Sequence, residues 1–361
     1  MSGKDRSWSG RQRRELLKSG LGGLALAAVS SSFPALLLAQ EAQPAQTKAG
    51  QLLNVSYDVA RELFTQINPA FASAWKARTG QVIEIRQSHG GSSTQARAVA
   101  DGLPADVVTL NQVTDINFLQ KSGLVAAGWQ DRFPNHASPY FSLPVFLVRA
   151  GNPKGIRDWD DLARPGVQVL LSNPKTSGNG RYAYLGAYAF GLQKSGGAEA
   201  AAQDLVAKVL SNVPIFDSGG RGASVSFVEH EIGDVLITFE SEVNSLKREY
   251  PAAGLQIIFP SQSVRVDFPV AVVDKVVDRN GTRALATAYL QFLYSEAGQD
   301  ILARNFNRVR DPNVAHRYQA QFPAVRLVSV EEQFGGWDAV AAKHFAAGAV
   351  LDQLLARVAK Q

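Results

Sequence analysis

Short apolar runs alternate with longer amphipathic runs along most of the chain, and the alternation occurs four times. Each time, an apolar run of strand length ends in a polar or glycine-rich turn, and a run with helical spacing follows. These units span residues 52–79, 81–102, 167–197 and 213–234. Strands that alternate with helices are typical of folds with largely parallel sheets. The pattern therefore predicts an α/β protein.

Two further apolar runs, at residues 143–153 and 264–277, have the length and β-branched content to cross between two domains. A chain that leaves one α/β lobe, builds a second and returns makes two lobes around a cleft. Amphipathic runs at residues 281–306 predict two helices that pack back on the first lobe, and residues 340–360 predict one more. The predicted lobes are residues 51–143 with 264–361, and residues 144–263.

The N-terminal residues 1–39 have the pattern of an export signal, with a basic start, an apolar stretch and small residues near Ala39. The run "RRELLK" at residues 13–18 resembles the twin-arginine type of signal. A single membrane anchor is the alternative, but glycine, serine and Pro34 interrupt the apolar stretch. Residues 40–50 form a polar linker.

The charge of the chain is concentrated in that N-terminal segment. The 361 residues carry a formal net charge of +5, and residues 1–39 hold six basic and two acidic residues, or +4. The rest therefore carries +5 − 4 = +1, which gives no support to a nucleic-acid partner. The chain has no cysteine, so it contains no disulfide, thiol nucleophile or thiolate metal site.

The turns that precede the predicted helices suit an anion. A helix N-terminus offers unpaired N–H groups and a partial positive charge, and ligands of open α/β sheets bind at the carboxyl ends of strands. Glycines let the backbone approach a ligand closely, and serines add hydroxyl donors. The residues concerned are Gly90, Gly91, Ser92, Ser93, Ser177, Gly178, Gly219 and Gly220. Ordinary helix capping is the alternative for each turn taken alone.

Eight runs carry a family resemblance, which extends from about Leu52 to the C-terminus. They are "LLNVSYDVARELF", "QSHGGSS", "ADVVTLNQVTD", "FLVRAGNPKGIRDWDDL", "NPKTSGNGRY", "DSGGRGAS", "IGDVLITFESEVN" and "FGGW". The chain resembles the periplasmic sulfate- and thiosulfate-binding proteins of ABC importers, and "TLNQVTD", "NPKTSGN" and "TFESEVN" are closer to the thiosulfate-binding branch. The resemblance implies a type II periplasmic-binding-protein fold, in which two lobes joined by crossover strands close on a fully ionised oxyanion.

The resemblance also implies which residues hold the anion, mostly through neutral donors. These are the backbone of Asp58 and residues Ser92, Ser177, Gly178, Asn179 and Gly220. We expect the side chain of Asp58 to face away from the anion and to cap the following helix. We expect Arg221 to support its turn from behind, with a direct contact to the anion as the alternative.

Two positions depart from the sulfate-binding pattern. Asn179 stands where that branch has glycine, and the backbone N–H survives this change. Phe239 stands where that branch has a tryptophan that donates its indole N–H, and phenylalanine cannot donate. One hydrogen bond is therefore lost, or is replaced by one from Ser241 or a water molecule, so strict sulfate preference is not expected and thiosulfate can be a ligand.

Other functions find less support in the residues. The run "HEIGD" at residues 230–234 lacks the second histidine of a zinc protease, and no phosphate-binding loop or G-x-S-x-G elbow occurs. We therefore expect no catalytic residue, no metal and no cofactor. Tyr182, Tyr184 and Tyr188 could hint at ferric ion, but their spacing spreads them around a helix. Molybdate, another tetrahedral dianion, stays open as an alternative ligand. The expected protein is a monomeric periplasmic receptor that serves an ABC permease.

Overall fold

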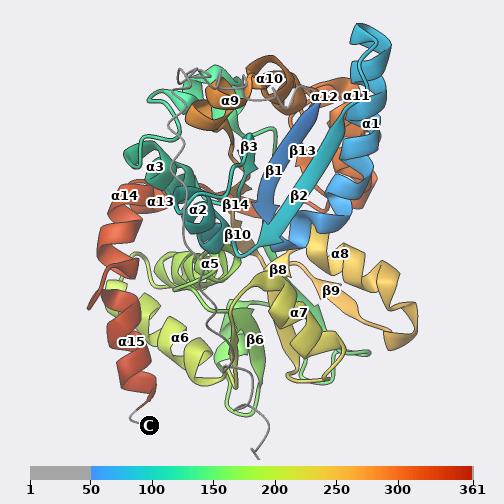
Figure 1. Ribbon diagram of the computed structural model, residues 1–361. Coiled ribbons are helices and arrows are strands. Elements are labelled where there is room, and N and C mark those ends of the chain that lie inside the picture. The colour runs from blue at the N-terminus through green and yellow to red at the C-terminus, as the bar shows by residue number, and fades with distance from the viewer. Residues whose placement is uncertain (1–49, 360–361) are drawn as a thin grey trace, which may run out of the picture. The chain divides into compact units, whose positions relative to one another are not determined.

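The computed structural model describes residues 50–359, whose helices and strands are shown in Figure 1. The predicted export signal and the linker up to residue 49 lie outside the described residues. Within residues 50–359, no helix combines the length and the apolar character that a membrane crossing requires.

The first lobe is built on a four-stranded sheet with the strand order β12-β3-β1-β2. Strand β1 pairs in parallel with β2 and β3, whereas β12 is antiparallel to β3. Its strands are β1 (Gln51–Tyr57), β2 (Glu84–Gly90), β3 (Val107–Thr109) and β12 (Val270–Val272). The helices in the same parts of the chain are α1 (Arg61–Thr79), α2 (Ser92–Ala100), α3 (Val113–Lys121), α9 (Asp274–Asn280), α10 (Arg283–Phe292), α11 (Glu296–Arg304) and α12 (Pro312–Arg317).

The second lobe is built on a five-stranded sheet with the order β7-β6-β8-β5-β9. Strand β6 pairs in parallel with β7 and β8, and β5 is antiparallel to both β8 and β9. Its strands are β5 (Pro144–Val148), β6 (Val169–Ser172), β7 (Phe216–Asp217), β8 (Val235–Phe239) and β9 (Gln256–Ile258). Its helices are α5 (Gly178–Lys194), α6 (Glu199–Ser211), α7 (Gly220–Val228) and α8 (Glu240–Glu249).

Both sheets therefore follow one plan, in which a central strand has a parallel neighbour on each side and an antiparallel strand stands beyond one of them. The antiparallel strands β12 and β5 belong to the two apolar runs that were predicted to cross between lobes. The run at 143–153 contains one strand, β5, and the run at 264–277 begins with the last residue of β10 and contains β11 and β12, so neither run is a single strand along its whole length. Strands before, within and after these runs form two small sheets: β4 (Tyr140–Ser142), β11 (Val266–Asp267) and β13 (Arg308–Val309) in one, β10 (Gln262–Val264) and β14 (Arg326–Val328) in the other.

The core explains why the central strands read as continuous apolar runs. All five residues of β5 are buried, and so are all five of β8. Phe146 and Val148 of β5 belong to the large core cluster, whereas Val145 and Leu147 belong to a second cluster on the other face. A strand buried on both faces loses the apolar–polar alternation of a half-exposed strand.

Helices α5 and α7 begin within the glycine-containing turns that were predicted to precede them. Their first helical residues are Gly178 and Gly220. Packing against β6 overrides the low helix propensity of the glycines here. A Cβ atom on Gly180 would lie 2.0 Å from the carbonyl oxygen of Ser172, so only glycine allows the helix to approach the strand so closely. The "TSGNG" turn is therefore partly the helix itself.

The C-terminal run, predicted as one helix over residues 340–360, is broken. Helix α14 (Trp337–Val340) continues into a π-helical turn (Ala341–Phe345), and a loop containing Gly348 at φ +74° separates it from α15 (Val350–Val358). Helix α15 lies beside α6, as Figure 1 shows, and Arg357 forms an ion pair with Asp204 at 2.8 Å. The end of the chain thus contacts the second lobe, although the predicted boundaries assign it to the first.

Short elements complete the described chain, and most of them are single turns. They are α4 (Pro134–Ala137), α13 (Val330–Phe334) and the 3-10 turns η1 (Asp58–Ala60), η2 (Trp129–Arg132), η3 (Trp159–Ala163), η4 (Pro251–Ala253) and η5 (Gln319–Gln321).

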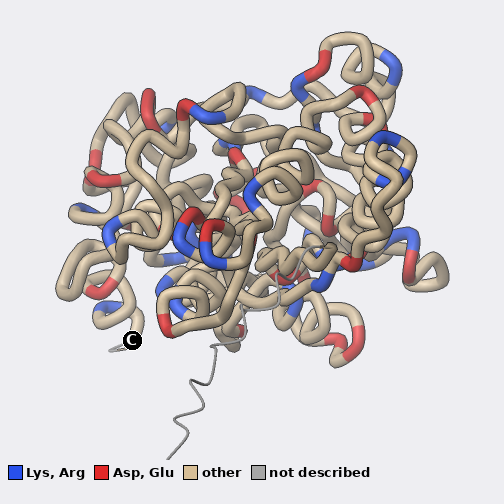
Figure 2. Tube along the Cα trace, turned by 45° about the horizontal axis from the view of Figure 1, so that its top comes forward, with Lys and Arg blue, Asp and Glu red and all other residues tan. Residues whose placement is uncertain are grey.

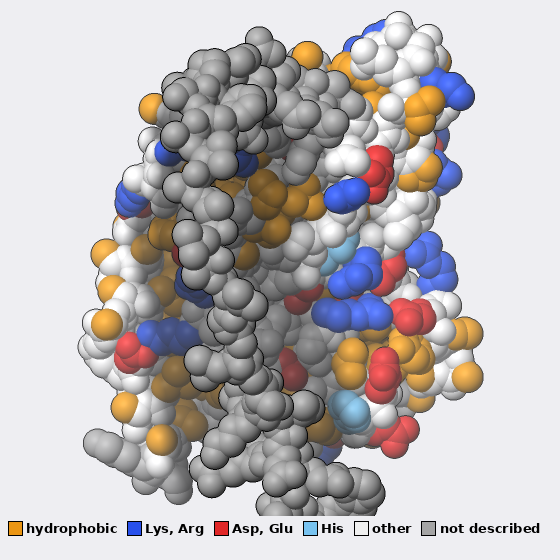
Figure 3. Space-filling model, in the orientation of Figure 1, with side chains coloured by type: hydrophobic (Ala, Val, Ile, Leu, Met, Phe, Trp, Pro, Cys, Tyr) orange, Lys and Arg blue, Asp and Glu red, His pale blue; other side chains and the backbone are white. Residues whose placement is uncertain are grey.

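Charges of both signs are mixed along the described chain, as Figure 2 shows. The visible part of the face in Figure 3 likewise carries blue and red side chains next to one another. This mixing agrees with the small net charge outside the N-terminal segment.

Candidate functional site

The carboxyl ends of the parallel strands of both sheets meet at one place. Asp58, which follows β1, accepts a hydrogen bond at 3.1 Å from the backbone N–H of Arg221 at the start of α7. Across the same junction, a Cβ atom on Gly178 would lie 2.1 Å from Oδ1 of Asn111, which follows β3. Loops from the two lobes are therefore in direct contact here.

Three helices begin at this junction without a side-chain cap from their own N-cap residue. The N-cap residues of α2, α5 and α7 are Gly91, Ser177 and Gly219, and none of the three makes a capping hydrogen bond through its side chain. The first N–H groups of a helix have no partner within the helix, and they carry the positive end of its dipole. Ordinary capping, the simpler interpretation of these turns, therefore does not account for Ser177.

Ser92 is buried at the start of α2, and its hydroxyl is already engaged. The hydroxyl donates to the Asp115 carboxylate at 2.6 Å and accepts from the N–H of Asn111 at 3.2 Å. The neighbouring Ser93 also donates to Asp115, at 2.8 Å. Only the backbone N–H of Ser92 is left for a ligand, so the hydroxyl donors expected from these two serines are used within the first lobe.

Ser177 keeps its hydroxyl proton available. Its Oγ accepts a hydrogen bond from Ser172 at 3.0 Å, at the end of β6. Asn179 directs its side chain into its own lobe, where Nδ2 donates to Thr238 at 2.8 Å. What Asn179 can offer a ligand is therefore its backbone N–H, at the second position of α5, beside the N–H of Gly178.

Asp58 links the two lobes through its carboxylate. One oxygen accepts from the N–H of Val59 at 3.0 Å, at the start of the following turn, and the other accepts from the N–H of Arg221. Burial raises the pKa of Asp58, and these backbone N–H groups oppose that shift. The carboxylate thus faces α7 as well as its own turn. It occupies the N–H of Arg221 and leaves that of Gly220 for a ligand.

The Arg221 side chain lies among carboxylates at the edge of the junction. Its guanidinium is 3.7 Å from Glu62 in the first lobe and 4.0 Å from Glu249 in the second. These contacts fit the supporting role predicted for Arg221.

Phe239 is fully buried at the end of β8, in an aromatic cluster beneath the junction. Its ring meets Phe268 and Tyr182 at centroid distances of 5.5 and 6.2 Å, both edge to face. Ser241, the expected replacement donor, lines a small pocket with Tyr57 and Val59. The volume of this pocket, about 10 Å³, is about that needed for one water molecule.

Sequence reasoning singled out neither Gln112 nor Asp115, which lie in the run "TLNQVTD" at the carboxyl end of β3. Asp115 is buried, and burial raises its pKa against the effect of the two serine hydroxyls. Gln112 accepts a hydrogen bond at 2.6 Å from Arg181 of the second lobe, so it bridges the lobes. The position of Gln112 in the turn after the parallel strand β3 was visible in the sequence, but neither the orientation of its amide nor the role of Asp115, inside α3, was.

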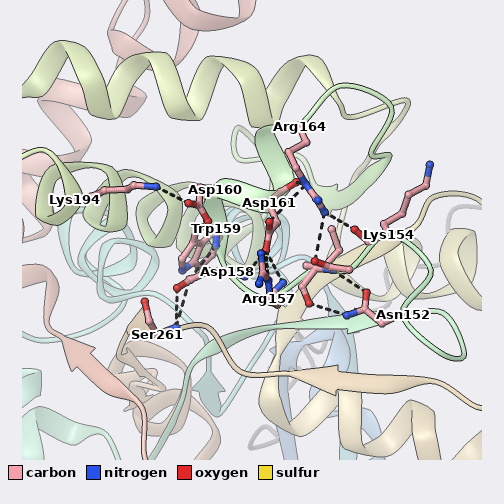
Figure 4. Close-up of polar contacts among 12 residues, drawn as sticks. Asn152, Lys154, Arg157, Asp158, Trp159, Asp160, Asp161, Arg164, Lys194 and Ser261 are labelled. Atoms are coloured by element: carbon pink, nitrogen blue, oxygen red, sulfur yellow. Dashed lines mark hydrogen bonds and ion pairs between the residues drawn. The ribbon is translucent and has the colours of Figure 1, made fainter.

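A larger pocket lies at the other end of α5, beside α6 and η3, with a volume of about 500 Å³. Its charged residues are already paired: Lys194 with Asp160 at 2.5 Å, and Lys208 with Asp204 at 2.7 Å. Figure 4 shows Lys194 reaching Asp160 next to the capped turn η3. With its cations neutralised in this way, the pocket is a poorer anion site than the helix N-termini at the junction.

The three tyrosines of α5 do not form one ligand set. Tyr182 packs on Phe239, whereas the Tyr184 hydroxyl is hydrogen-bonded to His344 at 2.9 Å and the Tyr188 ring packs on the same histidine. Within residues 50–359, no group of three or more His, Cys, Asp or Glu side chains is placed to hold a metal. This geometry does not favour a ferric site.

Comparison with known proteins agrees with a binding protein of this architecture. A family model described as bacterial extracellular solute-binding protein matches residues 53–307. The chain is 50% identical to a thiosulfate-binding protein of Pseudomonas aeruginosa, over 85% of this chain and 92% of that one. It is 47% identical to a sulfate-binding protein of Escherichia coli, over 85% and 93% of the two chains. The solved structure of the sulfate-binding protein SubI from Mycobacterium tuberculosis matches with a TM-score of 0.75 and 33% identity, covering 82% of this chain and 99% of that one.

The two facing α/β lobes are those of a solute-binding protein. The chain belongs to the bacterial extracellular solute-binding proteins, in the family of the thiosulfate-binding and sulfate-binding proteins. The resemblance and the periplasmic-binding-protein fold predicted from the sequence are thereby confirmed. These relatives are named as binding proteins rather than as enzymes.

Proposed function

We propose that the protein captures sulfate or thiosulfate between its lobes and delivers it to the permease of an ABC importer. The observation that carries the proposal is the meeting of three helix N-termini, those of α2, α5 and α7, at one junction, where no N-cap residue caps its own helix through its side chain. The names of the relatives that share about half of its residues support the choice of anion.

The proposed site is a shell of donors. Its members are the backbone N–H groups of Asp58, Ser92, Gly178, Asn179 and Gly220, and the hydroxyl of Ser177. Fully ionised sulfate and thiosulfate only accept hydrogen bonds, so such a shell matches them. Phosphate that retains a proton also presents a donor, which leaves a donor facing a donor. A buried mismatch of this kind rejects a ligand strongly.

The energies are sufficient without a counter-charge. Each hydrogen bond to a charged group contributes ~1.5–3 kcal/mol, so six give a gross ~9–18 kcal/mol. Desolvation of the anion and closure of the lobes reduce that sum, but micromolar affinity needs only ~8 kcal/mol. Arg221, already near two carboxylates, supports the turn of α7 and is not needed as a ligand.

The mechanism is closure rather than chemistry. Asp58 and Ser92 come from the first lobe, whereas Ser177, Gly178 and Gly220 come from the second, so a ligand that contacts both favours the closed form. The closed monomer then presents a surface from both lobes to the permease. No cofactor, metal or nucleic acid takes part.

Phe239 bears on the choice between the two anions. It cannot donate the hydrogen bond that the resemblance assigns to a tryptophan in the sulfate-binding branch. A site with one fixed donor fewer tolerates the larger, weakly accepting sulfur of thiosulfate. Thiosulfate is therefore the preferred ligand in our proposal, and molybdate, a tetrahedral dianion that differs in size, is the alternative.

The proposed location is the periplasm, reached by the twin-arginine route. The evidence for this route is the run "RRELLK" in the N-terminal segment. Replacing Arg13 and Arg14 together by lysine is expected to stop export, which fractionation of the host cell measures. Unchanged periplasmic yield would contradict the route but leave the binding function intact.

Titration calorimetry with purified protein tests the function. Sulfate, thiosulfate, molybdate and phosphate are compared at neutral pH after bound anions have been removed. We expect micromolar or tighter affinity for thiosulfate and sulfate, and no heat with phosphate. Binding of molybdate alone would replace the proposed ligand, and binding of none of the four would refute the function.

A further inference from the structure

Gln112 lies at the junction of the lobes, although neither the resemblance nor the donor shell includes it. It precedes α3 in the first lobe and is fully buried. Its Cγ would lie 2.8 Å from a Cβ atom on Gly178, in the first turn of α5. The side chain therefore packs directly on the helix end that offers three of the six proposed donors.

The orientation of the Gln112 amide is determined by Arg181. The guanidinium Nη1 is 2.6 Å from Oε1 of Gln112, and a guanidinium can only donate. The amide oxygen must therefore face Arg181, and the Nε2 group takes the other side. That Nε2 is buried and has no hydrogen-bond partner among residues 50–359.

The side chain of Asn111, the preceding residue, also has a buried polar atom without a hydrogen-bond partner. Oδ1 of Asn111 is buried without a partner in the described part of the chain, and it is the atom nearest to the Cβ position of Gly178. The Asn111 amide can turn over in its place with little change of shape, which presents its N–H group there. The side-chain amides of Asn111 and Gln112 thus each have one buried atom without a partner, close to the first turn of α5. Buried polar groups in native proteins are nearly always paired, so a missing partner is indicated.

We infer that the bound anion is that partner and that Gln112 donates its side-chain N–H to it. Gln112 is then a specificity-determining residue of the site, and Arg181 positions its amide. The inference rests on the proposed function. It adds a donor from the first lobe that supplements the backbone groups. Because Arg181 holds the oxygen, this amide offers no acceptor to a protonated anion such as hydrogen phosphate.

Two variants separate a donor from a merely structural residue. Gln112→Glu keeps the size of the side chain and the oxygen that accepts from Arg181, but it removes the N–H donors and adds a negative charge. Gln112→Leu removes both the donors and the bond to Arg181. Gln120→Leu, at the other end of α3, is the matched control. Thermal unfolding without anion checks that each variant folds, and calorimetry with thiosulfate and sulfate measures affinity.

We expect Gln112→Leu to lower the affinity about 10- to 100-fold, the effect of one hydrogen bond to a charged group. Gln112→Glu is expected to lower it further, and Gln120→Leu to leave it unchanged. If Gln112→Glu binds like the wild type, the residue only holds Arg181 and the inference is overturned, as it is if neither variant changes the affinity. A wild-type protein that binds neither anion would instead refute the proposed function.

Discussion

Replacing Gly178 by alanine separates closure of the lobes from the stability of the fold. The added Cβ would lie 2.1 Å from Oδ1 of Asn111 and 2.8 Å from Cγ of Gln112, both in the other lobe. Ordinary contact distances are about 3.5 Å, so the lobes or these side chains must yield by about 1 Å. Overpacking of this kind costs ~1–3 kcal/mol, and it falls on the closed form alone.

We therefore expect Gly178→Ala to bind thiosulfate about 10- to 100-fold more weakly, because ~1–3 kcal/mol of closure free energy is lost. Alanine is a better helix former than glycine, so the unfolding temperature without anion should stay equal or rise slightly. Calorimetry measures the first quantity and thermal unfolding the second.

Gly180→Ala is the matched control in the same helix. Its Cβ would meet the backbone oxygen of Ser172 at 2.0 Å, within the same lobe, so this variant should lose stability even without anion. The double variant Gly178→Ala with Asn111→Ala should regain part of the affinity. Wild-type affinity in Gly178→Ala, or a loss of stability as large as that in Gly180→Ala, would refute the reasoning.

Three further predictions concern buried residues. Phe239→Trp adds an indole donor and should raise the affinity for sulfate relative to thiosulfate about 10-fold in calorimetry; an unchanged ratio would show that this position does not select the anion. Burial raises the pKa of Glu242 from 4.5 to about 7. The free energy of unfolding therefore falls as the pH rises from about 4.5 to 7, because Glu242 ionises less readily in the folded protein than in the unfolded chain. Glu242→Gln keeps the oxygen that accepts from Ser224. It should raise the free energy of unfolding by up to ~3 kcal/mol above pH 7 and leave it unchanged below about pH 4.5, which denaturation at several pH values measures. An equal gain at all pH values would contradict the assignment. Arg308→Ala leaves Glu240, now paired at 2.7 Å and fully buried, without its partner and should cost ~3–5 kcal/mol in chemical denaturation; a loss below ~1 kcal/mol would mean that the pair is not needed.

The fold could be predicted from the sequence because each of its units is formed by residues that are close together in the chain. Each of the four units of strand, turn and helix, two in each lobe, repeats a pattern that neighbouring residues determine, and the two runs predicted to cross between lobes stand out by their apolar, β-branched content. The start of α5 was not readable, because it depends on the close approach of Gly180 to Ser172 in another element. The break before α15 depends in the same way on packing against α6.

Some features of the candidate site could likewise be predicted from local sequence, and others depend on tertiary contacts. Glycines and serines at helix starts are visible in the sequence, so Ser177, Gly178 and Gly220 could be named. Whether a serine hydroxyl is free is a question of tertiary contacts: that of Ser92 is engaged by Asp115, 23 residues away. Gln112 could not be found by spacing, since its unpaired amide exists only because Arg181 of the other lobe fixes its orientation.

A crystal structure of the protein with thiosulfate tests the central claim most directly. The account predicts the anion at the junction of the lobes, within hydrogen-bond distance of the backbone nitrogens of Gly178, Asn179 and Gly220 and of the Ser177 hydroxyl, with no cationic side chain in contact. An anion held instead by lysine or arginine side chains, at the pocket beside Lys194 or elsewhere, would contradict it.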